Sequence, residues 1–206
     1  MAKVLYPREQ LTVPCADGNE FAVRRVFCVG RNYAEHIREM GNDEREPPFF
    51  FGKPADRDAI ITRGGDVRYP PQTNDFHHEI ELVVAIWVDG AGIPVEEALG
   101  HVYGYGVGLD MTRRDLQAVA KKAGRPWDMA KGFDSSAVVG TLAHLGDDVH
   151  PDRGAITLRV NGELRQSGDL ADQIWNVAEI ISNLSRFVAI GAGDLIMTGT
   201  PAGVGP

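Results

Sequence analysis

Three acidic residues on two separate stretches of the sequence have the type and spacing that can bind a metal ion. Glu79 and Glu81 directly precede an apolar run over 82–88, and Asp110 directly follows the glycine-rich run over 102–109. Side chains of a strand alternate between its faces, so Glu79 and Glu81 project from the same side. Two carboxylates at the mouth of a buried strand repel each other and lose solvation, which favours a retained proton or a cation between them. If the two strands are neighbours, three hard oxygen donors converge, and such a set favours Mg²⁺ or Mn²⁺.

Two other interpretations of the acidic residues stay open. A Glu-x-Glu pair at the end of a strand is often a solvated rim that binds no ion. His77 has the same strand parity as Glu79, so an iron site built from histidine and carboxylates is a second alternative. The spacing alone does not decide between them.

A histidine and a glutamate lie together in the stretch that follows Gly30. Asn32, with Glu35 three residues later, has the form of a helix start. The short helix predicted from this start carries His36 and Glu39 on one face, where the glutamate could orient the imidazole. The alternative is an ordinary exposed helix with a surface histidine.

Further polar residues follow the third carboxylate. A helix predicted over 112–123 makes Arg114 and Gln117 close neighbours. Lys131 is predicted to lie in a loop, where a single lysine is usually solvated. The last loop, over 198–206, could offer backbone N–H groups and hydroxyls to a carboxylate, although a plain turn fits its composition equally well.

Composition limits the classes of function. The 206 residues include 21 basic and 29 acidic side chains, giving a net charge of −8, which argues against a surface for nucleic acid or an anionic membrane. No apolar run approaches the roughly 20 residues of a membrane span, and the first residues lack the apolar centre of a secretory signal. Cys15 and Cys28 form no CxxC pair and are interpreted as reduced thiols of a cytoplasmic protein.

The remaining pattern predicts a strand-rich α+β chain, because strands outnumber helices without regular βαβ alternation. Residues 1–22 are predicted to form an irregular lead-in with at most one short strand, and 23–206 to form a single domain. Asn161-Gly162 predicts the turn of a hairpin over 156–166. Other strands are predicted over 23–29, 49–53, 82–88 and 194–197, and a short helix over 94–99. A later helix is predicted from an apolar stripe at Ile174, Val177, Ile181, Leu184 and Val188.

Five motifs together resemble the fumarylacetoacetate hydrolase family, in the order that the family has them. They are VGRNYAEHIREM (29–40), HEIEL (78–82), GLDMT (108–112), AKGF (130–133) and TGTPAGVG (198–205). Within the family the chain is most similar to the acylpyruvate hydrolase branch, and REPPFFFGKPAD (45–56) favours the bacterial fumarylpyruvate hydrolases of gentisate breakdown.

The resemblance implies a mixed β-roll, usually a homodimer, with one Mg²⁺ or Mn²⁺ on Glu79, Glu81 and Asp110. It also implies that His36 and Glu39 are catalytic, on a short helix that closes over the substrate. The other site residues that it implies are Lys131 as a catalytic residue, Arg114 and Gln117 in the substrate site, and Thr198 or Thr200 at the substrate carboxylate. Family members usually continue past the last glycine-rich loop with further strands, so the resemblance implies either that the sequence is truncated after Pro206 or that the closing strands are absent.

The expected activity is metal-dependent hydrolysis of a carbon–carbon bond in a 2,4-dioxo acid, with 3-fumarylpyruvate and water giving fumarate and pyruvate. The alternatives are an acylpyruvase or oxaloacetate decarboxylase, a keto–enol or double-bond isomerase of the 2-hydroxymuconate type, and a protein that binds the ion for structural reasons. The last predicts that alanine at Glu81 lowers stability and that alanine at His36 has no effect.

Overall fold

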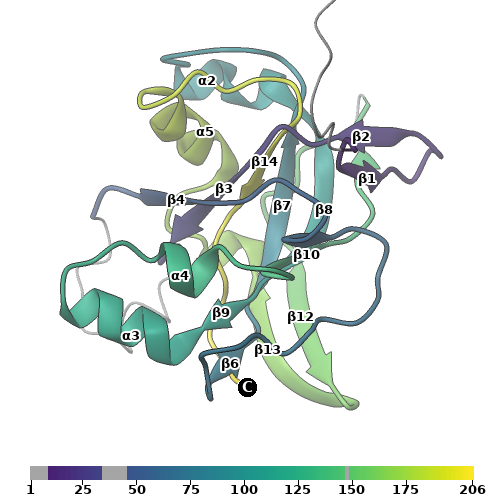
Figure 1. The fold of residues 1–206 in the computed structure, drawn as a ribbon. Helices are drawn as coiled ribbons and strands as arrows, with labels where there is room; N and C mark the ends of the chain where they lie inside the picture. The colour runs from purple at the N-terminus through teal and green to yellow at the C-terminus, as the bar shows by residue number, and fades with distance from the viewer. Residues whose placement is uncertain (1–8, 34–45, 147–148) are drawn as a thin grey trace, which may run out of the picture.

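The computed structural model describes residues 9–33, 46–146 and 149–206. Strands predominate in this part of the chain, so the strand-rich α+β prediction is confirmed (Figure 1). The helices are α2 (Val95–Ala98), α3 (Arg114–Lys122), α4 (Asp128–Lys131) and α5 (Val177–Ser185), with single 3-10 turns η1 (Leu99–His101) and η2 (Leu170–Asp172). The strands are β1 (Thr12–Pro14), β2 (Glu20–Ala22), β3 (Arg25–Gly30), β4 (Phe49–Lys53), β5 (Ile60–Ile61), β6 (Phe76–His77), β7 (Ile80–Ile86), β8 (Val102–Asp110), β9 (Thr112–Arg113), β10 (Ala137–Val139), β11 (Ala143–His144), β12 (Ala155–Val160), β13 (Glu163–Asp169) and β14 (Asp194–Met197).

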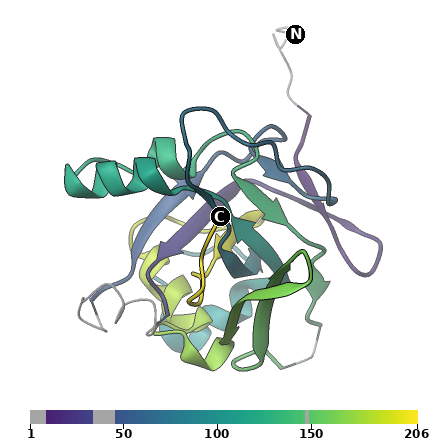
Figure 2. The ribbon, with the colours of Figure 1, turned by 90° about the horizontal axis from the view of Figure 1, so that it is seen from below.

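A mixed sheet forms the centre of the molecule. Its strand order is β4-β3-β14-β7-β8-β10-β5, and β11 pairs with β8 beside this path. The last strand, β14, lies parallel to β3 and antiparallel to β7, so it joins the two ends of the sequence within one sheet. Seen from below, the strands curl around the interior as half of a barrel, and α3 projects outside (Figure 2). This is the β-roll that the resemblance implied.

Strand β7 is buried along its whole length, and from Leu82 to Ile86 it is entirely apolar, because both of its faces are covered. Leu82, Val84 and Ile86 belong to one apolar cluster with residues of α5, whereas Val83 and Ala85 belong to another with residues of the β1–β2 hairpin. The alternation of side chains in a strand divides them between these clusters. A strand buried on both faces reads as a continuous apolar run, as this one does.

Two hairpins flank the sheet. Strands β12 and β13 pair around Asn161 and Gly162, whose φ angles of 52° and 84° fit a type I′ turn, so the predicted hairpin is confirmed. The prediction of at most one strand before residue 23 is wrong, because β1 and β2 pair antiparallel, with Thr12 opposite Ala22. Gly18 lies in the connecting turn with φ 88°, a conformation that glycine adopts without steric cost.

Several element boundaries differ from the sequence prediction. The central strand ends at Ile86, and Trp87 and Val88 beyond it are exposed. Helix α3 begins at Arg114, after residues that pair with β6 as β9. Helix α5 spans only Val177–Ser185, so the first and last members of the predicted stripe lie outside it.

Two predictions are not tested by this structure. The short helix expected around His36 and Glu39 falls within 34–45, outside the described residues. The division into a lead-in over 1–22 and one domain over 23–206 also stays a prediction. None of the helices in the described ranges combines the length and apolarity needed to cross a membrane.

Candidate metal centre and active site

The three carboxylates converge because β7 and β8 are antiparallel neighbours. Glu79 immediately precedes β7, Glu81 is its second residue, and Asp110 is the last residue of β8. The backbone N–H of Asp110 donates to the carbonyl of Glu79 at 2.9 Å, which fixes the end of one strand beside the start of the other. One carboxylate oxygen from each residue lies within 4.8 Å of the others, and all three residues are buried. The condition set by the sequence, that the two strands be neighbours, is met.

Basic side chains balance the charge of two of these carboxylates. The Lys131 ammonium lies 2.7 Å from Glu79 Oε2 and 2.7 Å from Asp110 Oδ2. Arg114 pairs with Glu79 Oε1, and the Lys53 ammonium lies 2.8 Å from Asp110 Oδ1. Burial would raise the pKa of Glu79, but the charges of Lys131 and Arg114 outweigh burial and lower this pKa to about 2.

Glu81 is left with less compensation. Within the described residues, its Oε2 accepts a hydrogen bond from the backbone N–H of Gly199 at 2.8 Å. Burial and the neighbouring charges of Asp110 and Glu79 raise the pKa of Glu81 well above its ordinary value. An added cation would offset this cost and keep the carboxylate ionised.

The donor set fits one divalent ion. Three buried carboxylates that face one another offer hard oxygen ligands of the kind that Mg²⁺ and Mn²⁺ prefer. Lys131 already places a positive charge between two of them, which shows where a cation is electrostatically favoured. The predicted divalent-metal site is therefore present in the fold.

His77 does not join this group. Its Nε2 lies 2.6 Å from Asp75 Oδ1, and its Nδ1 accepts from Arg114 Nε at 3.3 Å. Both ring nitrogens of His77 therefore have other partners, and the described residues give no support to the iron alternative.

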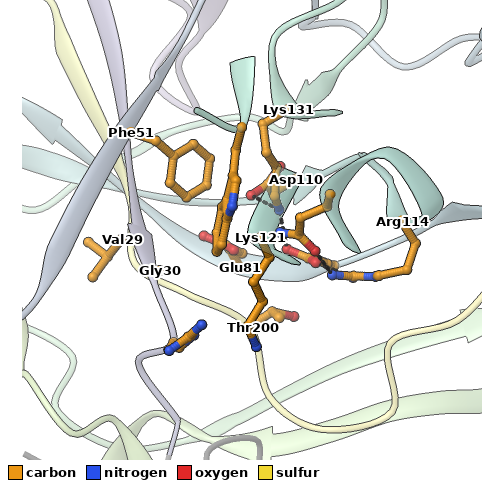
Figure 3. Close-up of a pocket in the computed structure, with 13 residues that line it drawn as sticks. Val29, Gly30, Phe51, Glu81, Asp110, Arg114, Lys121, Lys131 and Thr200 are labelled. Carbon is orange, nitrogen blue, oxygen red and sulfur yellow. Dashed lines mark hydrogen bonds and ion pairs between the residues drawn. The ribbon is translucent and has the colours of Figure 1, made fainter. Parts of the chain in front are cut away.

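A cavity opens in front of the carboxylates (Figure 3). Helix α3 supplies Arg114 and Gln117, and the Arg114 guanidinium donates to the Gln117 amide oxygen at 2.5 Å. Figure 3 shows Asp110 and Glu81 at the inner wall, with Lys131 above Asp110 and Arg114 to one side. The cavity is lined by Val29, Gly30, Arg31, Phe51, Glu79, Glu81, Asp110, Arg114, Gln117, Lys121, Trp127, Lys131 and Thr200.

The two threonines of the last loop differ in position. Thr200 lines the cavity, and its hydroxyl accepts from Gln166 Nε2 at 2.8 Å, which leaves its own hydrogen free to be donated. Thr198 is fully buried, and its hydroxyl donates to the Leu82 carbonyl and accepts from Gln173. Thr198 therefore holds the loop against β7 rather than lining the cavity.

Gly199, between the two threonines, stands at a position that requires glycine. Its φ is 97°, and a Cβ there would lie 2.7 Å from the Cβ of Asn32. Only glycine fits this position without strain, and its N–H then reaches Glu81.

The sequence interpretation placed Lys131 in a loop, and the structure corrects this. Lys131 is the last residue of α4 and is only 2% exposed. The interpretation gave no role to Lys53, which is also buried and pairs with Asp110. Its position at the end of the strand that begins with three phenylalanines was the available signal, because a lysine that continues an apolar strand is buried only when it is paired.

Comparison with known proteins agrees with this fold. The family model for the fumarylacetoacetate hydrolase C-terminal domain matches residues 25–206. A curled mixed sheet with a buried acidic triad defines the structural class, and the chain belongs to the fumarylacetoacetate hydrolase family.

Three relatives are particularly similar. The crystal structure of fumarylpyruvate hydrolase from Pseudomonas aeruginosa in complex with Mn²⁺ and pyruvate is 50% identical, has a TM-score of 0.93, and is matched over 99% of this chain and 89% of its own. A crystal structure from Burkholderia cenocepacia is 57% identical, has a TM-score of 0.90, and is matched over 100% of this chain and 85% of its own. The mitochondrial oxaloacetate tautomerase FAHD1 of Mus musculus is 42% identical over 89% of this chain and 82% of its own length.

Proposed function

We propose that the protein is a metal-dependent hydrolase of 2,4-dioxo acids that converts 3-fumarylpyruvate and water into fumarate and pyruvate. The observation that carries the proposal is the buried acidic triad at the base of a cavity that also contains Lys131 and Arg114. The 50% identity to a fumarylpyruvate hydrolase crystallised with Mn²⁺ and pyruvate supports this substrate class.

Glu79, Glu81 and Asp110 would hold one Mg²⁺ or Mn²⁺. When bound, this ion supplies Lewis-acid polarisation of the 2-oxo group. Arg114, already held by Glu79 and Gln117, would orient the substrate carboxylate, and the Thr200 hydroxyl would donate to it.

His36 is proposed as the general base that activates water, and Glu39 as the residue that orients it. Glu39 would hold the imidazole in the tautomer able to accept a proton, and His36 would then remove that proton from water. Hydroxide adds to C4, and Lys131 with Gln117 stabilises the alkoxide, an effect worth about 2.7–4 kcal/mol per donor. The C3–C4 bond breaks, its electrons remain on C3, and protonation of C3 gives pyruvate while C4 becomes a carboxyl group of fumarate.

A second candidate is keto–enol tautomerisation of oxaloacetate, favoured by the 42% identity to a protein named for that activity. Tautomerisation moves a proton between C3 and the C2 oxygen and needs no water attack. It would therefore depend on the metal site but not on a water-activating His36. Decarboxylation of oxaloacetate has the same requirements.

Turnover of 3-fumarylpyruvate, acetylpyruvate and oxaloacetate, each with Mg²⁺, Mn²⁺ or chelator, tests the proposal. We expect rapid metal-dependent loss of 3-fumarylpyruvate with equimolar pyruvate, and a loss of at least about 100-fold in kcat for His36→Ala. Efficient oxaloacetate tautomerisation without fumarylpyruvate cleavage would reject the proposal in favour of the second candidate.

We further propose that the protein acts on a small molecule as a cytoplasmic homodimer in aromatic catabolism, and not on nucleic acid or membranes. The net charge of −8 supports the absence of an anionic polymer partner. Sedimentation equilibrium measures the oligomeric state, and a monomer at micromolar concentration would contradict the dimer.

A further inference from the structure

Two basic residues of the cavity are not used by the acidic triad. Four basic side chains line the cavity, and two of them, Lys131 and Arg114, pair with Glu79. Lys121 and Arg31 form no ion pair with a carboxylate among the described residues. Among the described residues, the cavity therefore contains two cations that pair with none of its buried carboxylates.

Helix α3 places one of these residues at a definite distance from the triad. Arg114, Gln117 and Lys121 are spaced i, i+3, i+7, so they lie along one face of the helix, and all three line the cavity. Seven residues of helix rise about 10 Å along its axis. Arg114 thus marks the metal end of the cavity, and Lys121 lies about two turns away and points into the cavity (Figure 3). Lys121 and Lys122 are both exposed, but only Lys121 lines the cavity.

Arg31 comes from a different element. It follows the end of β3 with a φ of 59°, which is uncommon for a residue other than glycine. Its guanidinium carbon lies 5.7 Å from the centre of the Phe49 ring, which supports the side chain from one side. A strained backbone that aims a cation at a cavity is the kind of outlier that functional sites retain.

We propose that Lys121 and Arg31 bind the second carboxylate of a dianionic substrate and make the site selective for dioxo acids with an acidic acyl chain. The proposal rests on the proposed function and extends it, since it assigns the residues that recognise the far end of the substrate. The first carboxylate lies at the triad, beside Arg114, and a short unsaturated chain separates the two acid groups.

Chain length gives this assignment its selectivity. The acyl chain of 3-fumarylpyruvate ends in a carboxylate and extends away from the reacting carbonyl toward Lys121. Acetylpyruvate ends in a methyl group, which offers the two cations no charge. Oxaloacetate has a second carboxylate, but only one carbon separates it from its oxo group, so it remains at the metal end.

Steady-state kinetics of Lys121→Gln, Arg31→Asn and the double variant test this proposal. Asparagine is chosen for Arg31 because it tolerates positive φ, so the charge is removed without added backbone strain. We expect each single variant to raise KM for 3-fumarylpyruvate by about tenfold or more, the loss expected for one charged hydrogen bond, with little change in kcat. The same variants should change KM for acetylpyruvate by less than about twofold. Lys121→Arg keeps the positive charge and should retain most of the wild-type affinity for 3-fumarylpyruvate.

Lys122→Gln is the matched control, because it removes the same charge from the same helix outside the cavity. An equal effect of Lys121→Gln on fumarylpyruvate and acetylpyruvate, or an equal effect of Lys122→Gln, would overturn the proposal. Either result would show that the charge acts through the general field or through stability rather than by contact.

Binding of fumarate and of its monoanionic analogue crotonate separates this proposal from the proposed function. Trp127 lines the cavity, so its fluorescence can report occupancy. We expect Lys121→Gln to weaken fumarate about tenfold and to leave crotonate unchanged. If the wild type cleaves no dioxo acid but shows this pattern, the proposed function fails and the carboxylate site stands. If the wild type cleaves 3-fumarylpyruvate efficiently and Lys121→Gln does not change fumarate binding, the proposed function stands and the carboxylate site fails.

Discussion

At the scale of single residues, the site is a problem of charge balance in a buried volume. Each carboxylate loses hydration when it is buried, and an unpaired buried charge is strongly unfavourable. Lys131 and Arg114 compensate the charge of Glu79, and Lys131 and Lys53 compensate the charge of Asp110. Glu81, whose pKa is raised by burial and by the two neighbouring carboxylates, is the residue whose ionisation gains most from a bound metal ion.

Lys53 provides a prediction at this scale. Lys53→Met should lower the free energy of unfolding by about 3 kcal/mol in chelator, because Asp110 would lose one of its two cations in a buried site. Urea denaturation of the metal-free protein measures the change, and Lys122→Met controls for replacement of an exposed lysine. A loss no greater than that of the control would mean that Lys131 alone compensates Asp110.

At the scale of elements, β14 is fixed at its first residue. Asp194 is fully buried and accepts hydrogen bonds from Arg24, Arg25 and the N–H of Gly191. Because β14 lies between β3 and β7, these contacts attach the last strand to an early one. The loop that follows β14 carries Gly199, which places the contact with Glu81 at the opposite end of the same strand.

Asp194 gives a pH-dependent prediction. Burial opposes its ionisation, but hydrogen bonds from Arg24 and Arg25 outweigh burial and lower its pKa below the ordinary 3.8. Its contribution is therefore complete above pH 3.8 and is lost as pH falls through the lower pKa of the folded state. Asp194→Asn should cost about 2 kcal/mol at pH 7, and the difference from the wild type should shrink below pH 3.8.

Urea denaturation of both proteins between pH 7 and pH 3 checks this expectation. A difference that stays constant across the range would show that hydrogen-bond geometry, rather than the charge of Asp194, stabilises β14.

At the scale of the whole molecule, the sheet holds the metal ligands in place from both sides. The apolar clusters cover opposite faces of β7, and the candidate metal ligands lie at the start of that strand and at the end of β8. A metal ion that binds only the folded chain stabilises the entire fold, since the coordinating carboxylates are not brought together in the unfolded state.

Mn²⁺ should therefore stabilise the global fold. At a concentration of one hundred times its Kd, it should raise the free energy of unfolding by about 2.7 kcal/mol, and chelator should reverse the effect. Urea denaturation with and without Mn²⁺ measures the change. Glu81→Gln should abolish it, and Glu96→Gln, at an exposed position on α2, should retain it. An equal gain in Glu81→Gln would place the ion elsewhere.

Local patterns were sufficient for elements whose signal lies within a few residues. The Asn161-Gly162 turn specified its hairpin, and the apolar run over 82–88 indicated the buried strand that the structure places at Ile80–Ile86. The β1–β2 hairpin was missed although Asp17-Gly18 is a turn signal, because its strands are only three residues long. Strand ends were also misplaced, since apolar Trp87 and Val88 continue the pattern of the strand after it has left the core.

The sequence by itself determined the candidate metal ligands and the family, because motif identity and strand parity depend only on residue types and spacing. Only the tertiary structure decided which side chains surround them. Lys53 and Lys131 lie far apart in the chain, yet both contact Asp110 in a buried site. Thr198 and Thr200 are both buried and lie two residues apart, yet only Thr200 lines the cavity. The physical reason is that burial and pairing arise from contacts between distant segments, which no local pattern contains.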